Sequence, residues 1–261
     1  MRTLGRIHAD WLFVGPSAAI VHDLAIPPSA MWPLCIAKVG SGTYKGTSLP
    51  RRTRVQACEV VVLDGMRVTT IDQTVVDCMR QLPFAAALSV ADSYLRTTNQ
   101  TRECLEELVK PARMGQAGIR NARIVAAHAD GRAESWGDSE ARAAMLELGF
   151  ALPELQVPYL DPITEQCYRA DFSWDLADAG TVIGEMDGFS KYTDKTMSGG
   201  DKVGAFVRER QRESRLTIGG RSVIRFTPAQ VASRQYFEIL LESYGIPRAK
   251  PLSGWKELRS R

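Results

Sequence analysis

The chain of 261 residues holds little histidine and little cysteine, three and five residues respectively. Because the histidines are widely separated and the cysteines form no CxxC pair, the pattern excludes a histidine-rich or cysteine-rich metal site and a disulfide framework. The cysteines are therefore expected to be reduced thiols of a cytoplasmic protein. No apolar run approaches the roughly 20 residues needed to span a bilayer. The first residues also lack a signal-peptide h-region, so no membrane contact is expected.

The net charge of +3 is too small to indicate a nucleic-acid-binding protein, but the charges are unevenly distributed. Residues 201–261 carry 13 Lys and Arg against 6 Asp and Glu, whereas residues 131–200 are acidic. Acids next to arginines favour a metal site beside a phosphate-binding surface. The alternative is an ordinary solvated surface.

The pattern of elements changes near residues 129–132, and this predicts two domains, 1–130 and 131–261. The first is expected to be an α+β domain. Its expected helices are 15–24, 71–80, 85–95, 101–109 and 116–127. A strand is expected at 35–39, and an Asp64-Gly65 turn predicts a hairpin of 55–63 with 66–69.

The second domain is expected to be a mixed α/β sheet flanked by helices. Ser135 and Asp138 form a capping-box pattern before a helix that runs to Leu148. Strands are expected at 165–174, 181–187 and 221–226, and a helix at 203–216. Thr227-Pro228 should begin a last helix.

Two carboxylates in the expected hairpin are the main candidates for a site. If the loop centres on Asp178, Asp171 and Glu185 lie opposite each other and share a face. Asp187 adds a third acid. Oxygen ligands without nearby His or Cys suit Mg²⁺ or Mn²⁺, and such an ion promotes phosphodiester cleavage. The alternative is a hairpin with one exposed polar face.

Lys191 is the expected catalytic cation, since it follows Gly188 and could orient water or neutralise developing charge. Lys195 and Lys202 are alternatives. Asp138 is a further candidate metal ligand, although helix capping explains it equally well.

Arginines of the expected helix 203–216 are candidate DNA contacts. Arg208, Arg212 and Arg215 follow at spacings of 4 and 3, which places them on one helix face. Arg225 is grouped with them as DNA-binding. Glu209 and Glu213 lie on a neighbouring stripe, where they would partly neutralise the arginines.

The second half resembles the Vsr-like branch of the PD-(D/E)XK endonucleases over about residues 134–232. The resemblance is carried by Asp138-Ser139-x-x-Arg142, residues 153–157, Asp171-Phe172, Gly184-Glu185-Met186-Asp187-Gly188, Lys191-Tyr192, Arg212-Glu213 and residues 220–231. It implies a mixed sheet opened by a helix, and Mg²⁺-dependent cleavage of DNA. Asp171 and Glu185 would then be metal ligands, Asp138 would replace a Glu, and Asp187 stands where the motif has Lys.

The first half resembles AbiEi-type antitoxins. Its matching residues are Ser17-Ala18-Ala19-x-x-His22-x-Leu24, residues 68–77 and Ala91-Asp92-x-x-Leu95-Arg96, with Gln73 where that family has Arg. The resemblance implies a toxin–antitoxin context and a cognate toxin protein as partner.

Together these patterns predict a metal-dependent DNA endonuclease-like protein. The alternative is a non-catalytic DNA-binding antitoxin or transcriptional regulator that keeps the nuclease fold as a scaffold. An interaction module without a nucleic-acid role fits the arginine-rich segment less well.

Overall fold

A computed structural model describes residues 8–37, 51–53, 59–111, 116–161, 163–177, 180–187, 215, 217–218 and 220–249. The chain forms a mixed α/β structure and divides into two compact units, Met1–Ser139 and Glu140–Arg261. None of the helices in the described part of the chain is long and apolar enough to cross a membrane. None of the four described cysteines forms a disulfide.

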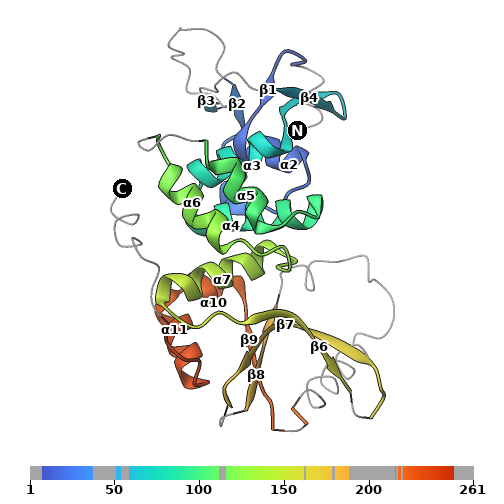
Figure 1. Cartoon of the computed structure of the whole chain (residues 1–261), viewed down its shortest axis with the longest axis vertical. Coiled ribbons are helices and arrows are strands. Elements are labelled where there is room, and N and C mark those ends of the chain that lie inside the picture. The colour runs from blue at the N-terminus through green and yellow to red at the C-terminus, as the bar shows by residue number, and fades with distance from the viewer. Residues whose placement is uncertain are drawn as a thin grey trace. The chain divides into compact units, whose positions relative to one another are not determined.

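Unit 1 combines a five-stranded sheet with a group of helices (Figure 1). The strand order is β3-β2-β1-β5-β4, with β1 parallel to β5, β2 parallel to β3, and the other two pairs antiparallel. Its strands are β1 (Leu12–Phe13), β2 (Cys35–Ala37), β3 (Arg51–Thr53), β4 (Val60–Leu63) and β5 (Met66–Thr69). Its helices are α2 (Gly15–Val21), η1 (Pro28–Ala30), α3 (Ile71–Gln81), α4 (Phe84–Thr98), α5 (Arg102–Val109) and α6 (Ile119–His128).

The turn between β4 and β5 has the conformation that its sequence predicts. Asp64 and Gly65 have φ angles of 50° and 77°, and positive φ at both central residues is what a two-residue hairpin turn requires. The next helix also begins as expected, because the Thr70 hydroxyl accepts the backbone N–H of Gln73 at the start of α3.

Unit 1 ends at Ser139, although the sequence pattern places the domain boundary after residue 130. Buried Asp92 on α4 gives the physical reason. Its carboxylate accepts the Asp130 backbone N–H at 2.7 Å and the Ser139 hydroxyl at 2.8 Å. The segment 130–139, including the first turn of α7 (Trp136–Leu148), is therefore held to α4.

Unit 2 is built on a four-stranded sheet in the order β6-β7-β8-β9 (Figure 1). The strands β6 (Glu154–Leu160), β7 (Cys167–Asp175) and β8 (Thr181–Met186) form an antiparallel meander, and β9 (Ser222–Phe226) is parallel to β8. The helices α10 (Pro228–Ala232) and α11 (Arg234–Ser243) follow β9. The sequence predicts one helix here, but Ser233 separates two.

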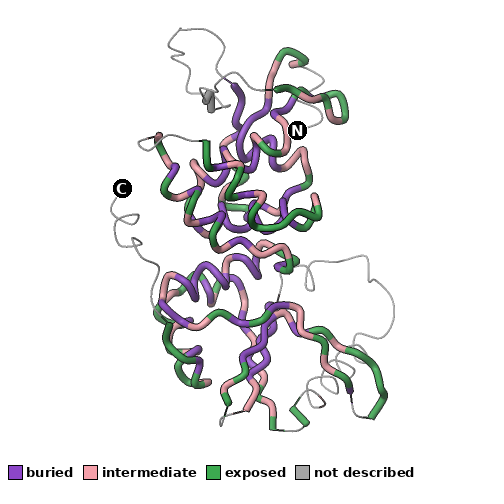
Figure 2. The backbone as a smooth tube through the Cα atoms, viewed as in Figure 1, coloured by how far each residue is buried: buried purple, intermediate pink, exposed green. Residues whose placement is uncertain are grey.

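Aromatic side chains fill the core of unit 2. Phe172 on β7 and Phe226 on β9 lie with ring centroids 5.6 Å apart, and Phe226 contacts Phe237 of α11 at 5.1 Å. All three are fully buried. Figure 2 shows the buried residues gathered where β7, β8 and β9 pair, while residues 163–167, in the turn between β6 and β7 and at the start of β7, are exposed. The core of unit 2 therefore lies where β7, β8 and β9 pair.

Candidate functional site

The sheet of unit 2 divides at the position of the two predicted site carboxylates. Pairing of β7 with β8 stops at Phe172↔Gly184. Beyond that pair, β7 continues beside β6 as far as Cys167, whereas β8 continues beside β9 as far as Met186. We call this divergence the fork (Figure 1). Continued by one residue, the register Phe172↔Gly184 puts Asp171 opposite Glu185, as the loop-centre argument predicts.

Asp171 lies on the β7 side of the fork, and its carboxylate bridges to both neighbouring strands. One oxygen accepts the backbone N–H of Met186 on β8 at 3.0 Å, and the other accepts the Gln156 side-chain amide of β6 at 3.4 Å. The hydrogen bond from the Met186 N–H to the Asp171 carboxylate thus links β7 and β8 just beyond their last backbone pair. Gln156 has a φ of 56°, an uncommon conformation for a non-glycine residue.

Glu185 lies on the β8 side of the fork and is paired in register with Arg225 of β9. The guanidinium of Arg225 lies 3.7 Å from the Glu185 carboxylate and 3.4 Å from that of Asp187. Glu185 is buried, with 5% of its surface exposed. Burying a carboxylate is costly unless a cation or hydrogen bonds compensate it, so Arg225 neutralises part of the charge of these two acids. The arginine predicted to contact DNA is therefore the counter-ion of the candidate site.

The other predicted site residues are found in different surroundings. Asp138 is buried at the start of α7, where its carboxylate accepts the backbone N–H groups of Glu134 and Ser135 at 3.0 and 2.9 Å. These contacts are the helix-capping arrangement that its sequence also predicts. Arg215 pairs with the Asp161 carboxylate at 3.1 Å. Lys191, Arg208 and Arg212, together with Lys195 and Lys202, lie outside the described residues.

In the part of the chain that the structure describes, no group of three or more His, Cys, Asp and Glu side chains is arranged to hold a metal ion. The candidate metal site therefore rests on two carboxylates, Asp171 and Glu185. That donor set still fits Mg²⁺, which is often held by one or two carboxylates, with waters and substrate phosphates as its other ligands.

Sequence reasoning did not identify Gln156 as a site residue. Its contact with Asp171 depends on the positive φ of Gln156, and a glutamine gives no sequence signal for that conformation. The sequence pattern also predicted that Arg225 contacts DNA, and not that it pairs with Glu185 and Asp187. The Glu185–Arg225 pair follows from the parallel register of β8 and β9. That register cannot be predicted from the sequence, because the two strands are far apart along the chain.

In unit 1, the residues that carry the antitoxin resemblance make internal contacts. The Ser17 hydroxyl accepts the Cys35 backbone N–H at 2.7 Å, and the His22 ring lies 2.8 Å from the Thr69 carbonyl oxygen. Arg96 donates to the Ala133 carbonyl. These side chains join the helices to the strands and to the segment before α7.

Buried Asp77 completes this set. The Gln73 side-chain amide donates to one of its carboxylate oxygens at 3.0 Å. Burial raises the pKa of the Asp77 carboxyl, while the bond from Gln73 and the charge of Arg80 act in the opposite direction.

The comparisons with known proteins give relatives but no function. Two curated relatives, the uncharacterized proteins MT2308 and Rv2248 of two Mycobacterium tuberculosis strains (CDC 1551 / Oshkosh and ATCC 25618 / H37Rv), are each 39% identical over 112 residues. The match covers 43% of this chain and 41% of each relative, so the chain spans about two fifths of their length. No protein-family model matches the chain, and no solved structure matches it.

Proposed function

We propose that unit 2 is a Mg²⁺-dependent DNA endonuclease domain whose metal ligands are Asp171 and Glu185. The observation that carries this proposal is the fork, where Asp171 and Glu185 are the residues next to Phe172↔Gly184, the last pair of β7 with β8 in a mixed sheet. The helix α7 before the sheet and the parallel strand β9 at its end also agree with the architecture that the nuclease resemblance implies.

The roles of the individual residues follow from their contacts. Bound Mg²⁺ supplies Lewis-acid chemistry for phosphodiester hydrolysis. Asp171 is oriented by Gln156 and by the Met186 backbone N–H, so its carboxylate is held before any ligand arrives. Arg225 places a positive charge beside Glu185, where it can stabilise a phosphate. Lys191 remains the proposed second cation, and DNA the proposed partner.

The test is cleavage of supercoiled plasmid and of single-stranded DNA with Mg²⁺, Mn²⁺ or EDTA. Wild-type protein should cleave with either metal and not in EDTA. Asp171→Asn should abolish cleavage, because it removes a charged ligand at nearly constant volume. Glu165→Gln removes an exposed carboxylate from the turn between β6 and β7 and is the matched control that should keep activity. Equal cleavage by wild type and Asp171→Asn would refute the proposed site.

A second function is favoured by one observation, the pairing of Arg225 with Glu185 and Asp187. Because this arginine already neutralises acids at the fork, the fold can be maintained without a metal. The alternative is therefore a non-catalytic DNA-binding antitoxin or regulator with a cognate toxin as partner. Such a protein would bind DNA in EDTA with unchanged affinity and would cleave none. The predicted cytoplasmic location belongs to both proposals, since DNA is the substrate or ligand in each.

A further inference from the structure

Arg225 contacts two acids of the fork at once, through the two ends of its guanidinium. One terminal nitrogen lies 3.7 Å from the Glu185 carboxylate, and the other lies 3.4 Å from the carboxylate of Asp187, the residue after β8. A tight hydrogen bond between a guanidinium and a carboxylate is about 2.7–2.9 Å long, so both contacts are loose. They are held mainly by the attraction of opposite charges, and another anion can replace the acids as partner.

The backbone of Arg225 is held by pairing and by burial. Arg225 is in register with Glu185 in the parallel pairing of β9 with β8. Its neighbours Ile224 and Phe226 are 1% and 0% exposed, and alternation along the strand directs them to the other face of the sheet. The Asp187 backbone N–H donates to the Phe226 carbonyl at 3.0 Å. A change of partner at Arg225 is therefore a movement of its side chain.

The guanidinium is the part of this ion pair that a ligand from solvent can reach. The Arg225 side chain is 22% exposed, whereas that of Glu185 is 7% exposed. A guanidinium binds phosphate through two parallel N–H···O hydrogen bonds. A DNA phosphate is therefore a suitable alternative partner for Arg225, and it would neutralise the positive charge beside Glu185.

The same positive charge opposes a metal ion at the fork. Glu185 is one of the two carboxylates that fit Mg²⁺, and the guanidinium of Arg225 already pairs with it. A second cation on this carboxylate would be repelled by the guanidinium, and the repulsion is strong where little water screens it. Metal affinity should therefore be low while Arg225 stays with the acids and higher once a phosphate has taken the guanidinium.

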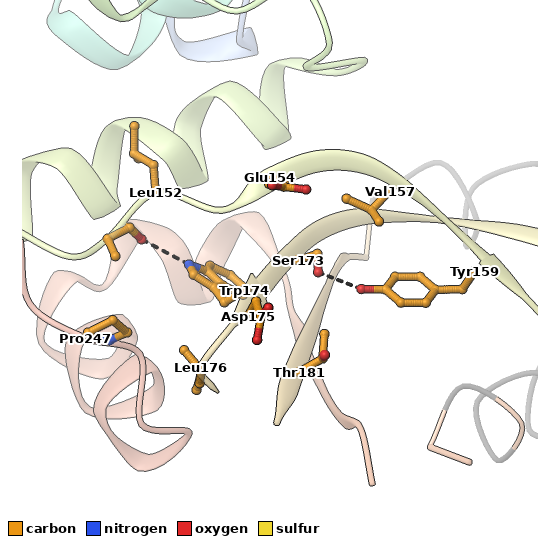
Figure 3. A pocket seen from close by; sticks show the side chains of 11 residues that line it. Leu152, Glu154, Val157, Tyr159, Ser173, Trp174, Asp175, Leu176, Thr181 and Pro247 are labelled. Atoms are coloured by element: carbon orange, nitrogen blue, oxygen red, sulfur yellow. Dashed lines mark hydrogen bonds between the residues drawn. The ribbon is translucent and has the colours of Figure 1, made fainter. Parts of the chain in front are cut away.

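The other end of the paired part of β7 and β8 does not suit DNA. A cavity of about 440 Å³ lies there, beside the pair Asp175↔Thr181. Figure 3 shows Glu154 and Asp175 among its lining side chains. No Lys, Arg or His belongs to the described lining, so the charge of this cavity repels a phosphate. The fork is the end of the sheet where a cation faces solvent beside the acids.

We propose that Arg225 couples DNA binding to metal binding at the fork. Its guanidinium pairs with Glu185 and Asp187 in the DNA-free protein and pairs with a DNA phosphate in the complex. Asp171 and Glu185 then bind the metal weakly without DNA and tightly with it. Because coupling between two ligands is reciprocal, the metal strengthens DNA binding by the same factor. This inference rests on the proposed nuclease function, which supplies both ligands.

The first test measures Mn²⁺ binding to the full chain without DNA, through the electron paramagnetic resonance signal of the free ion. Arg225→Gln keeps a side-chain N–H donor but removes the charge, so it should bind Mn²⁺ roughly tenfold more tightly than wild type. Arg234→Gln is the matched control, because Arg234 is 24% exposed and pairs at 2.9 Å with Glu147, whose side chain is 7% exposed. It should bind Mn²⁺ as wild type does. Adding Asp171→Asn to Arg225→Gln should abolish binding if the ion lies at the fork.

The second test measures the affinity for a labelled phosphorothioate duplex, which resists cleavage, by fluorescence anisotropy in Mn²⁺ and in EDTA. Wild type should bind the duplex roughly tenfold more tightly in Mn²⁺. The gain should be largely lost in Arg225→Gln, where no guanidinium has to change partner, and kept in Arg234→Gln. Circular dichroism checks that each variant is folded, and Arg225→Met replaces Arg225→Gln if the latter is not. The wild-type measurement needs no variant.

Three results would each overturn the coupling: equal Mn²⁺ affinity of wild type and the folded Arg225 variant, a wild-type duplex affinity that Mn²⁺ does not change, or an equal Mn²⁺ gain in both proteins. The nuclease proposal would survive any of them, provided that Asp171→Asn still abolishes cleavage. Failure to find an Asp171-dependent Mn²⁺ site, with or without the duplex, would instead overturn the proposed metal site and the coupling together.

Discussion

Replacing Arg225 by methionine should destabilise unit 2 and make it sensitive to Mg²⁺. The guanidinium lies 3.7 Å from Glu185 and 3.4 Å from Asp187, and the Glu185 side chain is only 7% exposed. Removing one partner of a buried ion pair costs about 3–5 kcal/mol. Since 22% of the Arg225 side chain is exposed and both distances exceed 3 Å, the lower end of that range, about 3 kcal/mol, is expected. For a unit of this size, that loss lowers Tm by roughly 12 °C.

Mg²⁺ at a hundred times its Kd should restore about 2.7 kcal/mol if it binds the folded state only. At one fixed Mg²⁺ concentration the recovery should be larger in Arg225→Met than in wild type, because the variant's acids have lost their counter-ion and bind Mg²⁺ more tightly. Arg215→Met is the matched control. It also removes an arginine paired with a buried aspartate of unit 2, Asp161, but away from the fork. Thermal unfolding with and without Mg²⁺ measures both effects. Equal Mg²⁺ recovery in the two variants would refute a metal site at the fork.

Three further outcomes are expected. Burial raises the folded-state pKa of Asp77 above its usual 3.8, so ionisation of this carboxyl lowers the stability of the folded protein as pH rises through that pKa. In denaturant unfolding, Asp77→Asn should therefore be more stable than wild type at pH 7 but not at pH 3. Gly184→Ala should destabilise unit 2 by about 1–3 kcal/mol in the same assay, since the new Cβ would lie 2.9 Å from the Phe172 Cβ; an unchanged midpoint would contradict this. Burial opposes ionisation of Asp161, but hydrogen bonds and the charge of Arg215 lower its pKa overall, so its stabilising effect should be complete above pH 3.8 and lost on acidification. Asp161→Asn should therefore flatten the acid limb of the stability profile.

The elements that the sequence predicts best are those whose signals are local. The Asp64-Gly65 turn and the capping threonines at Thr70 and Thr227 each fix their own neighbourhood through φ angles or side-chain bonds to the backbone. The strands β1 and β3 were not predicted. They contain two and three residues, and their pairing with distant strands defines them, not any periodicity of their own.

The candidate site was predictable only in part, for a similar reason. The β7–β8 register beside Asp171 and Glu185 follows from counting residues across one hairpin, which sequence alone allows. The fork, the Gln156 contact and the Arg225 pairs depend on how β6 and β9 add to that hairpin. The cavity beside Trp174 likewise combines residues of three strands with the segments around Ala151 and Pro247, and no spacing in the sequence brings these together.

The hydrogen bond from the Met186 N–H to Asp171 makes the fork a point of thermodynamic linkage. It joins β8 to a strand that has already turned away to pair with β6. A ligand that draws the Asp171 carboxylate away from β8 must break that bond and loosen the junction of the two strand pairs. By reciprocity, a force that bends the β6–β7 hairpin changes the affinity of Asp171 for its ligand. The β6–β7 hairpin and the Asp171 carboxylate are therefore coupled, so that a ligand that bends the hairpin would change binding at the carboxylate.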